Sequence, residues 1–329
     1  MCIWAAGYDA SRAGSAAWNA AFGSPFAFFS GTLKRATPLL TLGIAISVAF
    51  RAGVLNIGAD GQFLAGAAAS VAVALTFSSW PRMVLLPMEL LVGACAGAAW
   101  AGGAAVLKRR YAVGEVVSTL LLNFVATNLI GYLVRGPLQE PSHSYPQTPQ
   151  IAPAGRLPIL LPGQRLHWGF VIAVAVAIGA WWFFQRTAAG FRMRVVGASP
   201  SVAYSAGLID VGAVQARALI ASGAIAGLAG CCEVAGVTYG LYEGLSPGYG
   251  YTAIAVALLG GLGAGGVVVS ALLFGALAAG ADGMQRDAGI PPEFASIAAA
   301  MMILGMLIAS TVQRARGAAP APIRSDAGS

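Results

Sequence analysis

Residues 51–62 read RAGVLNIGADGQ, and they lead into a short apolar run from about Phe63 to Phe77. A second short run, ending at about Gly261, follows SPGYG at residues 246–250. At a rise of about 1.5 Å per residue, neither run comfortably crosses a hydrocarbon core of about 30 Å as a regular helix. Short, glycine-broken segments at matching places in two halves of a chain indicate a solute path near the membrane midplane.

The composition places the whole chain in a membrane. Of its 329 residues, 58% are apolar and only 9% are charged, and the mean hydropathy is +0.76. Soluble domains carry about 25% charged residues, so this chain has too few to cover a water-facing surface. Its apolar runs are continuous and lack the alternation of barrel strands. We therefore predict an all-α polytopic membrane protein with about nine transmembrane segments.

The apolar runs divide into two similar halves. Residues 33–134 and 214–312 each hold four segments, and the second segment of each half is short. Counting the crossings starts the first half outside and the second half inside, which predicts two inverted repeats with short discontinuous helices. The predicted segments are 33–50, 63–77, 83–107, 115–134, 168–185, 214–237, 250–261, 267–281 and 294–312.

The predicted regions follow from these segments. Seven prolines between the halves exclude a helix there and indicate an external loop. We expect both histidines, His143 and His167, to be solvated in or at the edge of that loop. The regions are an external amphipathic segment (1–32), a single transmembrane domain (33–312), the loop (135–167), a cytoplasmic segment (187–213) and a disordered cytoplasmic tail (313–329).

Positive charge sets the predicted orientation. The net charge is +7, but the arginines are scattered at the edges of apolar runs, which is typical of membrane interfaces and not of a nucleic-acid-binding face. Placing the basic clusters at 108–110, 186–194 and 314–316 in the cytoplasm gives a consistent path with the C-terminus inside and the N-terminus outside. We expect a multi-pass protein of the plasma (bacterial inner) membrane.

Several kinds of chemistry are absent from the sequence. The two lysines do not follow a glycine-rich loop, so the chain has no P-loop for ATP hydrolysis. It contains neither a zinc-protease motif nor a nucleophile elbow, and its four cysteines lack the spacing of metal ligands. We predict a protein that is not an enzyme, and no metal or cofactor bound by this chain.

Four polar residues form a stripe along the predicted helix at 115–134. Glu115, Thr119, Asn123 and Thr127 recur at every fourth position and so share one helix face. Lipid penalises such a face, which should point to the bundle interior or to a cavity. The stripe either lines a path for a polar solute or bridges packed helices. Glu115 lies near the cytoplasmic edge, where it is an interfacial charge on the second interpretation.

Other polar residues surround the broken segments and one span. Residues 51–60 lie toward the cytoplasmic side in the predicted topology, as an unwound path element or a plain turn. The tyrosines at 239–251 lie near the outer mouth, where they stack on a solute or form an interfacial belt. An acid inside a span is a functional candidate unless it reaches solvent at the outer end. The path candidates are Asn56, Gln62, Thr119, Asn123, Thr127, Glu233, Ser246 and Tyr251.

Residues 190–207, GFRMRVVGASPSVAYSAG, form the main predicted cytoplasmic segment. A serine suits the N-cap, a proline the first helical position, and a glycine the end of a short helix. The segment is either a docking element or a plain amphipathic connector. Its candidate residues are Arg192, Arg194, Gly197, Ser199, Pro200, Ala203, Tyr204 and Gly207.

At these residues the chain resembles the permease subunits of ABC importers for ribose-like sugars and nucleosides, over nearly all of residues 32–312. The form Glu-x-x-x-Thr-x-x-x-Asn is similar to the nucleoside (guanosine-type) branch. Ser199 departs from the asparagine usual in the family, and relatives carry one more transmembrane helix before the stretch resembling residues 1–32. The stretches that carry the resemblance are RAGVLNIGADGQ (51–62), GEVVST (114–119) with Leu122-Asn123, 194–207, 250–260, and Met284-Gln285 with Gly289-Ile290-Pro291.

The resemblance implies a permease subunit that translocates nucleosides or related simple sugars. It implies ten helices with both ends inside, and ATP used by a separate ATPase subunit that docks on residues 192–207. A second permease subunit, identical or related, and an extracytoplasmic substrate-binding protein would complete the importer, with membrane lipid around it and no nucleic acid. Two alternatives stay open: an ion-coupled secondary transporter using Glu233 or Asp60, and a structural membrane subunit that does not transport.

Overall fold

The computed structural model describes residues 9–205 and 210–290, together with single positions between 297 and 308. In these residues, seven helices are long and apolar enough to cross a membrane, which confirms the prediction of an all-α polytopic membrane protein. The predicted span at 294–312 and the tail at 313–329 lie largely or wholly outside the described residues, as does Gly207.

The first half runs from one end of the bundle to the other four times. The unpredicted helix α2 precedes it, and the π-helical turn η1 continues directly into α3, so the first span is longer than predicted. The elements are α2 (Ala10–Phe22), η1 (Ala27–Leu33), α3 (Lys34–Phe50), α4 (Ala59–Thr76), α5 (Arg82–Tyr111) and α6 (Glu115–Arg135).

The long loop, the spanning helix α7 and two short helices precede the second half. Here the π-helical turn η3 extends α10, and α12 is longer than the predicted 267–281 segment. The elements are η2 (Pro153–Gly155), α7 (Gly169–Arg186), α8 (Ala188–Ala198), α9 (Pro200–Ser205), α10 (Val211–Glu233), η3 (Val234–Thr238), α11 (Tyr249–Leu259) and α12 (Ala264–Ala288).

The prediction of two short segments is confirmed for one of them. Helix α11 has 11 residues and is too short to span. Helix α4 has 18 residues and qualifies as a span, so that part of the prediction is wrong. The predicted run started at Phe63 because Asp60 and Gln62 are polar, whereas the structure buries both side chains inside the helical bundle, where they find hydrogen-bond partners.

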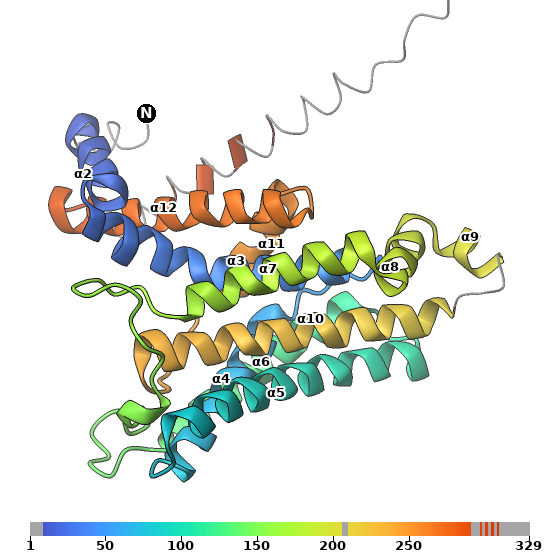
Figure 1. Ribbon diagram of the computed structural model, residues 1–329, viewed down its shortest axis with the longest axis horizontal. Coiled ribbons are helices and arrows are strands. Elements are labelled where there is room, and N and C mark those ends of the chain that lie inside the picture. Colours follow the sequence, from blue (N-terminus) through green and yellow to red (C-terminus); the bar gives the residue numbers. More distant parts are fainter. Residues whose placement is uncertain are drawn as a thin grey trace, which may run out of the picture.

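Helices of each half pack against helices of the other half. Helices α4 and α5 pack on α10 of the second half, and α11 and α12 pack on α3 of the first half. The end of α3 packs near the start of α10, where Val48 and Ala218 share one buried cluster, and the two helices run in opposite directions (Figure 1). Figure 1 shows the long loop before α7 at one end of the bundle, the loop end, and α8 and α9 at the other, the α8 end.

Glycines bring the central helices together. Gly93 and Gly97 of α5 lie against Gly223 and Gly227 of α10, and Gly66 of α4 also lies against Gly227. A Cβ added at Gly97 would lie 2.7 Å from Cα of Gly227, where no side chain fits. Small residues four apart let membrane helices approach through their backbones. The helix spacing in the bundle centre therefore depends on these glycines.

The loop end is covered by the chain between α6 and α7. Its backbone is tied to the segment after α10 by bonds from Thr148 N to Leu241 O and from Ile151 N to Tyr239 O, at 2.9 and 2.8 Å. His143 is exposed, as predicted. His167 is not: its side chain is 1% exposed, and its Nδ1 accepts the Gly169 N–H at 3.1 Å. The prediction of a solvated His167 is therefore wrong. A proline-rich composition indicates a loop but does not show that this loop packs tightly enough to bury an imidazole.

Replacing Gly97 with alanine should destabilise the protein by about 2–3 kcal/mol, because the methyl group collides with the backbone of α10. Thermal unfolding in detergent measures this effect. The matched control is Gly102→Ala on the same helix, where an added Cβ meets nothing within 4 Å and alanine favours the helix. Equal unfolding temperatures for the two variants would contradict the glycine contact.

The buried His167 should make stability depend on pH. Burial, helped by the charge of Lys34, lowers the pKa of His167 from 6.5 to about 4. Between pH 6.5 and pH 4 the imidazole of the unfolded chain binds a proton, whereas that of the folded chain stays neutral. The free energy of unfolding therefore falls as the pH drops from 6.5 toward 4, by at most about 3 kcal/mol. His167→Asn keeps an acceptor for Gly169 but cannot take the proton. Unfolding measured at pH 7 and pH 4.5 should show a smaller loss for that variant than for wild type.

Candidate functional site

The two helices that follow the glycine-rich stretches begin against each other. Asp60, in the first turn of α4, accepts hydrogen bonds at Oδ1 from the Ser246 hydroxyl at 2.7 Å and from the Gly250 N–H at 2.9 Å. The Ser246 hydroxyl in turn accepts the Tyr249 N–H at 3.1 Å. The carboxylate thus satisfies one free N–H at the start of α11 directly and a second through Ser246, at a place where the helix dipole also favours an anion. A Cβ at Gly250 would collide with the backbone of Asp60, so only glycine permits this approach.

Asn123 of α6 braces the same junction. Its Oδ1 accepts the Gly61 N–H at 2.8 Å, and its Nδ2 donates to Ile57 O at 2.9 Å and to the Tyr251 hydroxyl at 3.1 Å. The side chain is 3% exposed. Because the neighbouring backbone and the phenol occupy both ends of the amide, Asn123 positions the start of α4 and has no amide group left over for solute.

A third polar cluster fixes the chain just before α4. Asn56 donates to Gln62 Oε1 at 2.9 Å and to the Ser222 hydroxyl of α10 at 2.8 Å, and Gln62 donates back to Asn56 Oδ1 at 3.0 Å. All three side chains are at most 1% exposed. Buried amides need their partners inside the protein, and here they have them. Asn56 and Gln62 therefore anchor the loop after α3 and do not face an open path in this structure.

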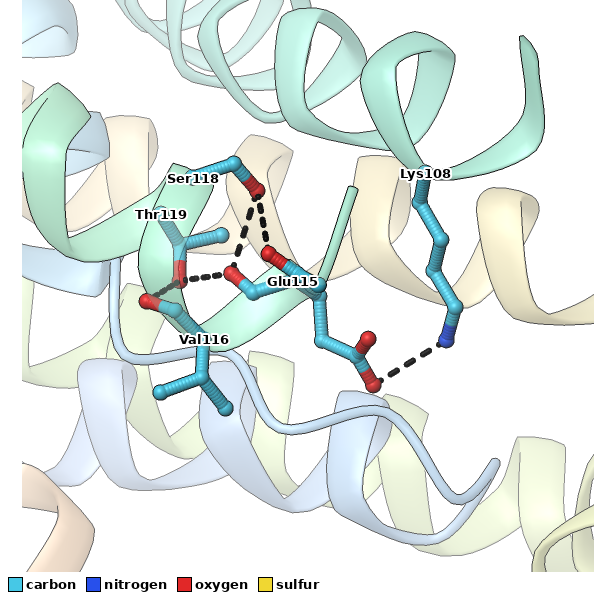
Figure 2. A network of polar contacts seen from close by, with 6 residues as sticks. Lys108, Glu115, Val116, Ser118 and Thr119 are labelled. Carbon is cyan, nitrogen blue, oxygen red and sulfur yellow. Dashed lines mark hydrogen bonds and ion pairs between the residues drawn. The ribbon is translucent and has the colours of Figure 1, made fainter. Parts of the chain in front are cut away.

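The beginning of α6 is held differently (Figure 2). Glu115 accepts a hydrogen bond from Lys108 Nζ of α5 at 3.0 Å, so it is paired at the α8 end of the bundle, which agrees with an interfacial charge. Thr119 is fully buried, and its hydroxyl donates to Glu115 O at 2.6 Å. Because the Thr119 hydroxyl is hydrogen-bonded within its own helix, Thr119 contributes packing at the junction.

The open part of the stripe lies further along α6. The hydroxyl of Thr127 donates to Asn123 O at 3.0 Å, but Thr127 is exposed, unlike Thr119, and a hydroxyl that donates one hydrogen bond can still accept another. The same four-residue spacing continues to Gly131 and Arg135. They line a hollow of about 350 Å³ together with Asn128, Tyr132, Gly136 and Glu243. Arg135 and Glu243, which both line this hollow, form an ion pair at 2.6 Å. The predicted stripe ended at Thr127 and did not include Arg135 or Glu243. Continuing the same four-residue spacing along α6 would have identified Arg135.

The predicted path residues thus separate into three groups. Six of them lie on or beside the α4–α11 junction, where Tyr251 is exposed, and Thr127 lies one turn further along α6 and is also exposed. Glu233 is buried at the end of α10, near Lys34, and is not among them. The predicted topology separated residues 51–60 from the tyrosines at 239–251 across the membrane. That separation is wrong for Asp60 and Gly250, which bond directly because both helices begin inside the bundle.

The segment at the α8 end consists of two helices. Ser199 is extended between α8 and α9, and its hydroxyl accepts the Val202 N–H at 3.5 Å, in the predicted capping position ahead of Pro200. Ala203 is buried, whereas Tyr204 is 77% exposed. Arg192 and Arg194 are exposed on α8, and Gly197 lies against the backbone of Arg51.

Sequence reasoning also missed a buried acid on α5. Glu89 is fully buried, lies against Gly155 of the loop, and has no hydrogen-bond partner among the described residues. It occupies the loop end, away from the α8 end. An acid inside a membrane span is by itself a functional candidate. The position of Glu89 within the predicted span 83–107 was therefore the signal that could have identified it.

Comparisons with known proteins agree with this architecture. The family model described as "Branched-chain amino acid transport system / permease component" matches residues 28–309. The guanosine ABC transporter permease NupP of Bacillus subtilis is 35% identical over 92% of this chain and 87% of its own. A glucose ABC transporter permease of Haloferax volcanii is 36% identical over 86% of this chain and 77% of its own. A nucleoside ABC transporter permease of Lactococcus lactis is 30% identical over 83% and 77%. No solved structure gives a significant match.

Removing the carboxylate of Asp60 should loosen the junction. In Asp60→Ala the Gly250 N–H and the Ser246 hydroxyl lose their acceptor inside the bundle, which should cost about 2 kcal/mol of unfolding free energy. Asp60→Asn keeps an oxygen at Oδ1 and should cost about 1 kcal/mol or less. Thermal unfolding of the purified variants measures both effects. A wild-type unfolding temperature for Asp60→Ala would show that the two bonds do not hold α4 to α11.

Proposed function

This chain belongs to the family of permease components of branched-chain amino acid transport systems and is an ABC transporter permease of the sugar and nucleoside class, and we propose that nucleosides or related simple sugars are its solutes. In this proposal the chain binds no cofactor, and a separate ATPase subunit supplies the energy. The named solutes of the relatives, guanosine, nucleosides and glucose, all carry sugar hydroxyls.

The observation that supports this proposal best is the open polar face of α6. Thr127, Asn128 and the Arg135–Glu243 pair are exposed on a membrane-spanning helix and its end. Hydrocarbon around such a face is costly, so water or another protein must cover it. We propose that a second permease subunit faces α6 and closes a water-filled path between the two chains. Hydroxyl and amide groups on that face suit a sugar, and the exposed ring of Tyr251 suits stacking on a base.

The ends of the bundle suggest where the other partners bind. The basic clusters at 108–110 and 186–194 lie at the α8 end, which we assign to the cytoplasm, since short cytoplasmic loops are rich in lysine and arginine. The exposed Arg192, Arg194 and Tyr204 there are the proposed docking surface for the ATPase. The loop end then faces outward, toward a substrate-binding protein. We also propose that the C-terminus lies in the cytoplasm.

Transport should depend on the hydroxyl of Thr127. In proteoliposomes that contain the permease, its ATPase and its binding protein, Thr127→Val should lower uptake of a radiolabelled nucleoside about fivefold, the value of one neutral hydrogen bond. The matched control is Val125→Thr, the reverse change on an exposed position of α6 that lies off the stripe, which should leave uptake unchanged.

The same assay tests the proposed function. We expect wild-type uptake to require ATP and the ATPase subunit. Uptake that persists without the ATPase and collapses with a proton or sodium gradient would contradict it in favour of an ion-coupled transporter. An intact assembly that moves none of the nucleosides or sugars tested would contradict the proposed solute class.

A further inference from the structure

One arginine joins the α8 end to both helices of the junction. Arg51 follows α3, and its Nε donates to Leu262 O, in the turn between α11 and α12, at 2.8 Å. Its guanidinium lies over the ring of Phe184 near the end of α7, 4.8 Å from the ring centroid. Phe184 is 4% exposed, so the ring is fixed. The Arg51 side chain thus spans three elements that are far apart in sequence.

The backbone of Arg51 makes the fourth contact. Gly197, near the end of α8, lies so close to Arg51 O that an added Cβ would collide with it. Gly53 has a φ of +72° and lies in the turn next to Gly197. A Cβ added at Gly53 would lie 3.3 Å from the Cα of Gly197. A displacement of α8 therefore presses directly on the main chain that leads into α4.

These contacts close a ring. From Arg51 the chain runs through residues 52–58 into α4, and Asp60 binds the start of α11. Helix α11 ends in a turn in which Gly261 and Leu262 both have positive φ, and the Leu262 carbonyl returns to Arg51. Among the described residues, no carboxylate lies within ion-pair distance of Arg51. A carbonyl and a ring hold this cation, and such contacts are weaker than a buried ion pair and can be remade during a conformational cycle.

We propose that Arg51 is the positioning residue through which movement of α8 is transmitted to α4 and α11 together. The inference rests on the proposed function, in which the ATPase docks on α8 and α9. Without the guanidinium, α8 still presses on the loop, but the turn after α11 is no longer tied to it. The start of α11 is then still held to α4 by Asp60, but its far end no longer follows α8, and ATP hydrolysis proceeds with little solute movement.

The test is the number of solute molecules moved per ATP hydrolysed, measured in proteoliposomes with the complete importer. Arg51→Met should assemble with the ATPase and keep basal ATP hydrolysis, while uptake per ATP falls about tenfold, the size of a typical coupling between sites. Arg51→Lys keeps the cation over Phe184 and should restore part of the ratio. The matched control is Arg186→Met, an exposed arginine at the end of α7, which should keep the wild-type ratio.

The outcomes separate this inference from the proposed function. A wild-type importer without ATP-driven uptake would overturn the proposed function itself. A working wild type with an unchanged ratio in Arg51→Met would overturn the role of Arg51 alone. If Arg51→Met fails to assemble, Phe184→Leu takes its place, because it leaves the bond to Leu262 but removes the ring beneath the guanidinium. A fall of about threefold in that variant supports the proposal, and a wild-type ratio overturns it.

Discussion

The close approach of helix backbones at the bundle centre is the constraint on which the rest of the structure depends. Hydrocarbon gives no hydrophobic drive for helices to associate, so packing between complementary surfaces must supply the attraction. Here the surfaces are nearly bare backbone, with Gly93 and Gly97 on one side and Gly227 on the other. This spacing sets α4 and α5 on α10. It thereby fixes the depth at which α4 begins and the place where Asp60 meets α11.

The polar groups at the junction are mostly occupied with the protein itself. Asn56, Asp60, Gln62 and Asn123 bind backbone and neighbouring side chains, and each is at most 7% exposed. A buried polar network is stable only when all of its members find partners. These residues therefore hold two helix beginnings in place, and the solute path that we propose runs instead along the open side of α6.

The sequence predicted the helical class, the eight apolar segments within the described range and the short helix α11, because apolar length and glycine signal these locally. It underestimated α4, since Asp60 and Gln62 look like interruptions until their partners on other helices are known. It placed Thr119 and Asn123 on one face correctly but left open whether that face binds solute or helices. That choice depends on contacts with Ile57, Gly61 and Tyr251, which no local pattern contains. His167 was misjudged for the same reason, because its burial comes from chain elsewhere at the loop end.

The exchange of partners between the halves has a consequence for biosynthesis. Helices α4 and α5 are made long before α10, yet α10 carries the surface on which both of them pack. A nascent first half leaves the ribosome with Gly66, Gly93 and Gly97 facing lipid and with Asn56 lacking the Ser222 hydroxyl. The early helices must wait, loosely associated, in the membrane or beside the insertion machinery until α10 arrives. We therefore expect the bundle to complete its folding only after α10 is made, because the first half alone lacks the surface on which α4 and α5 pack.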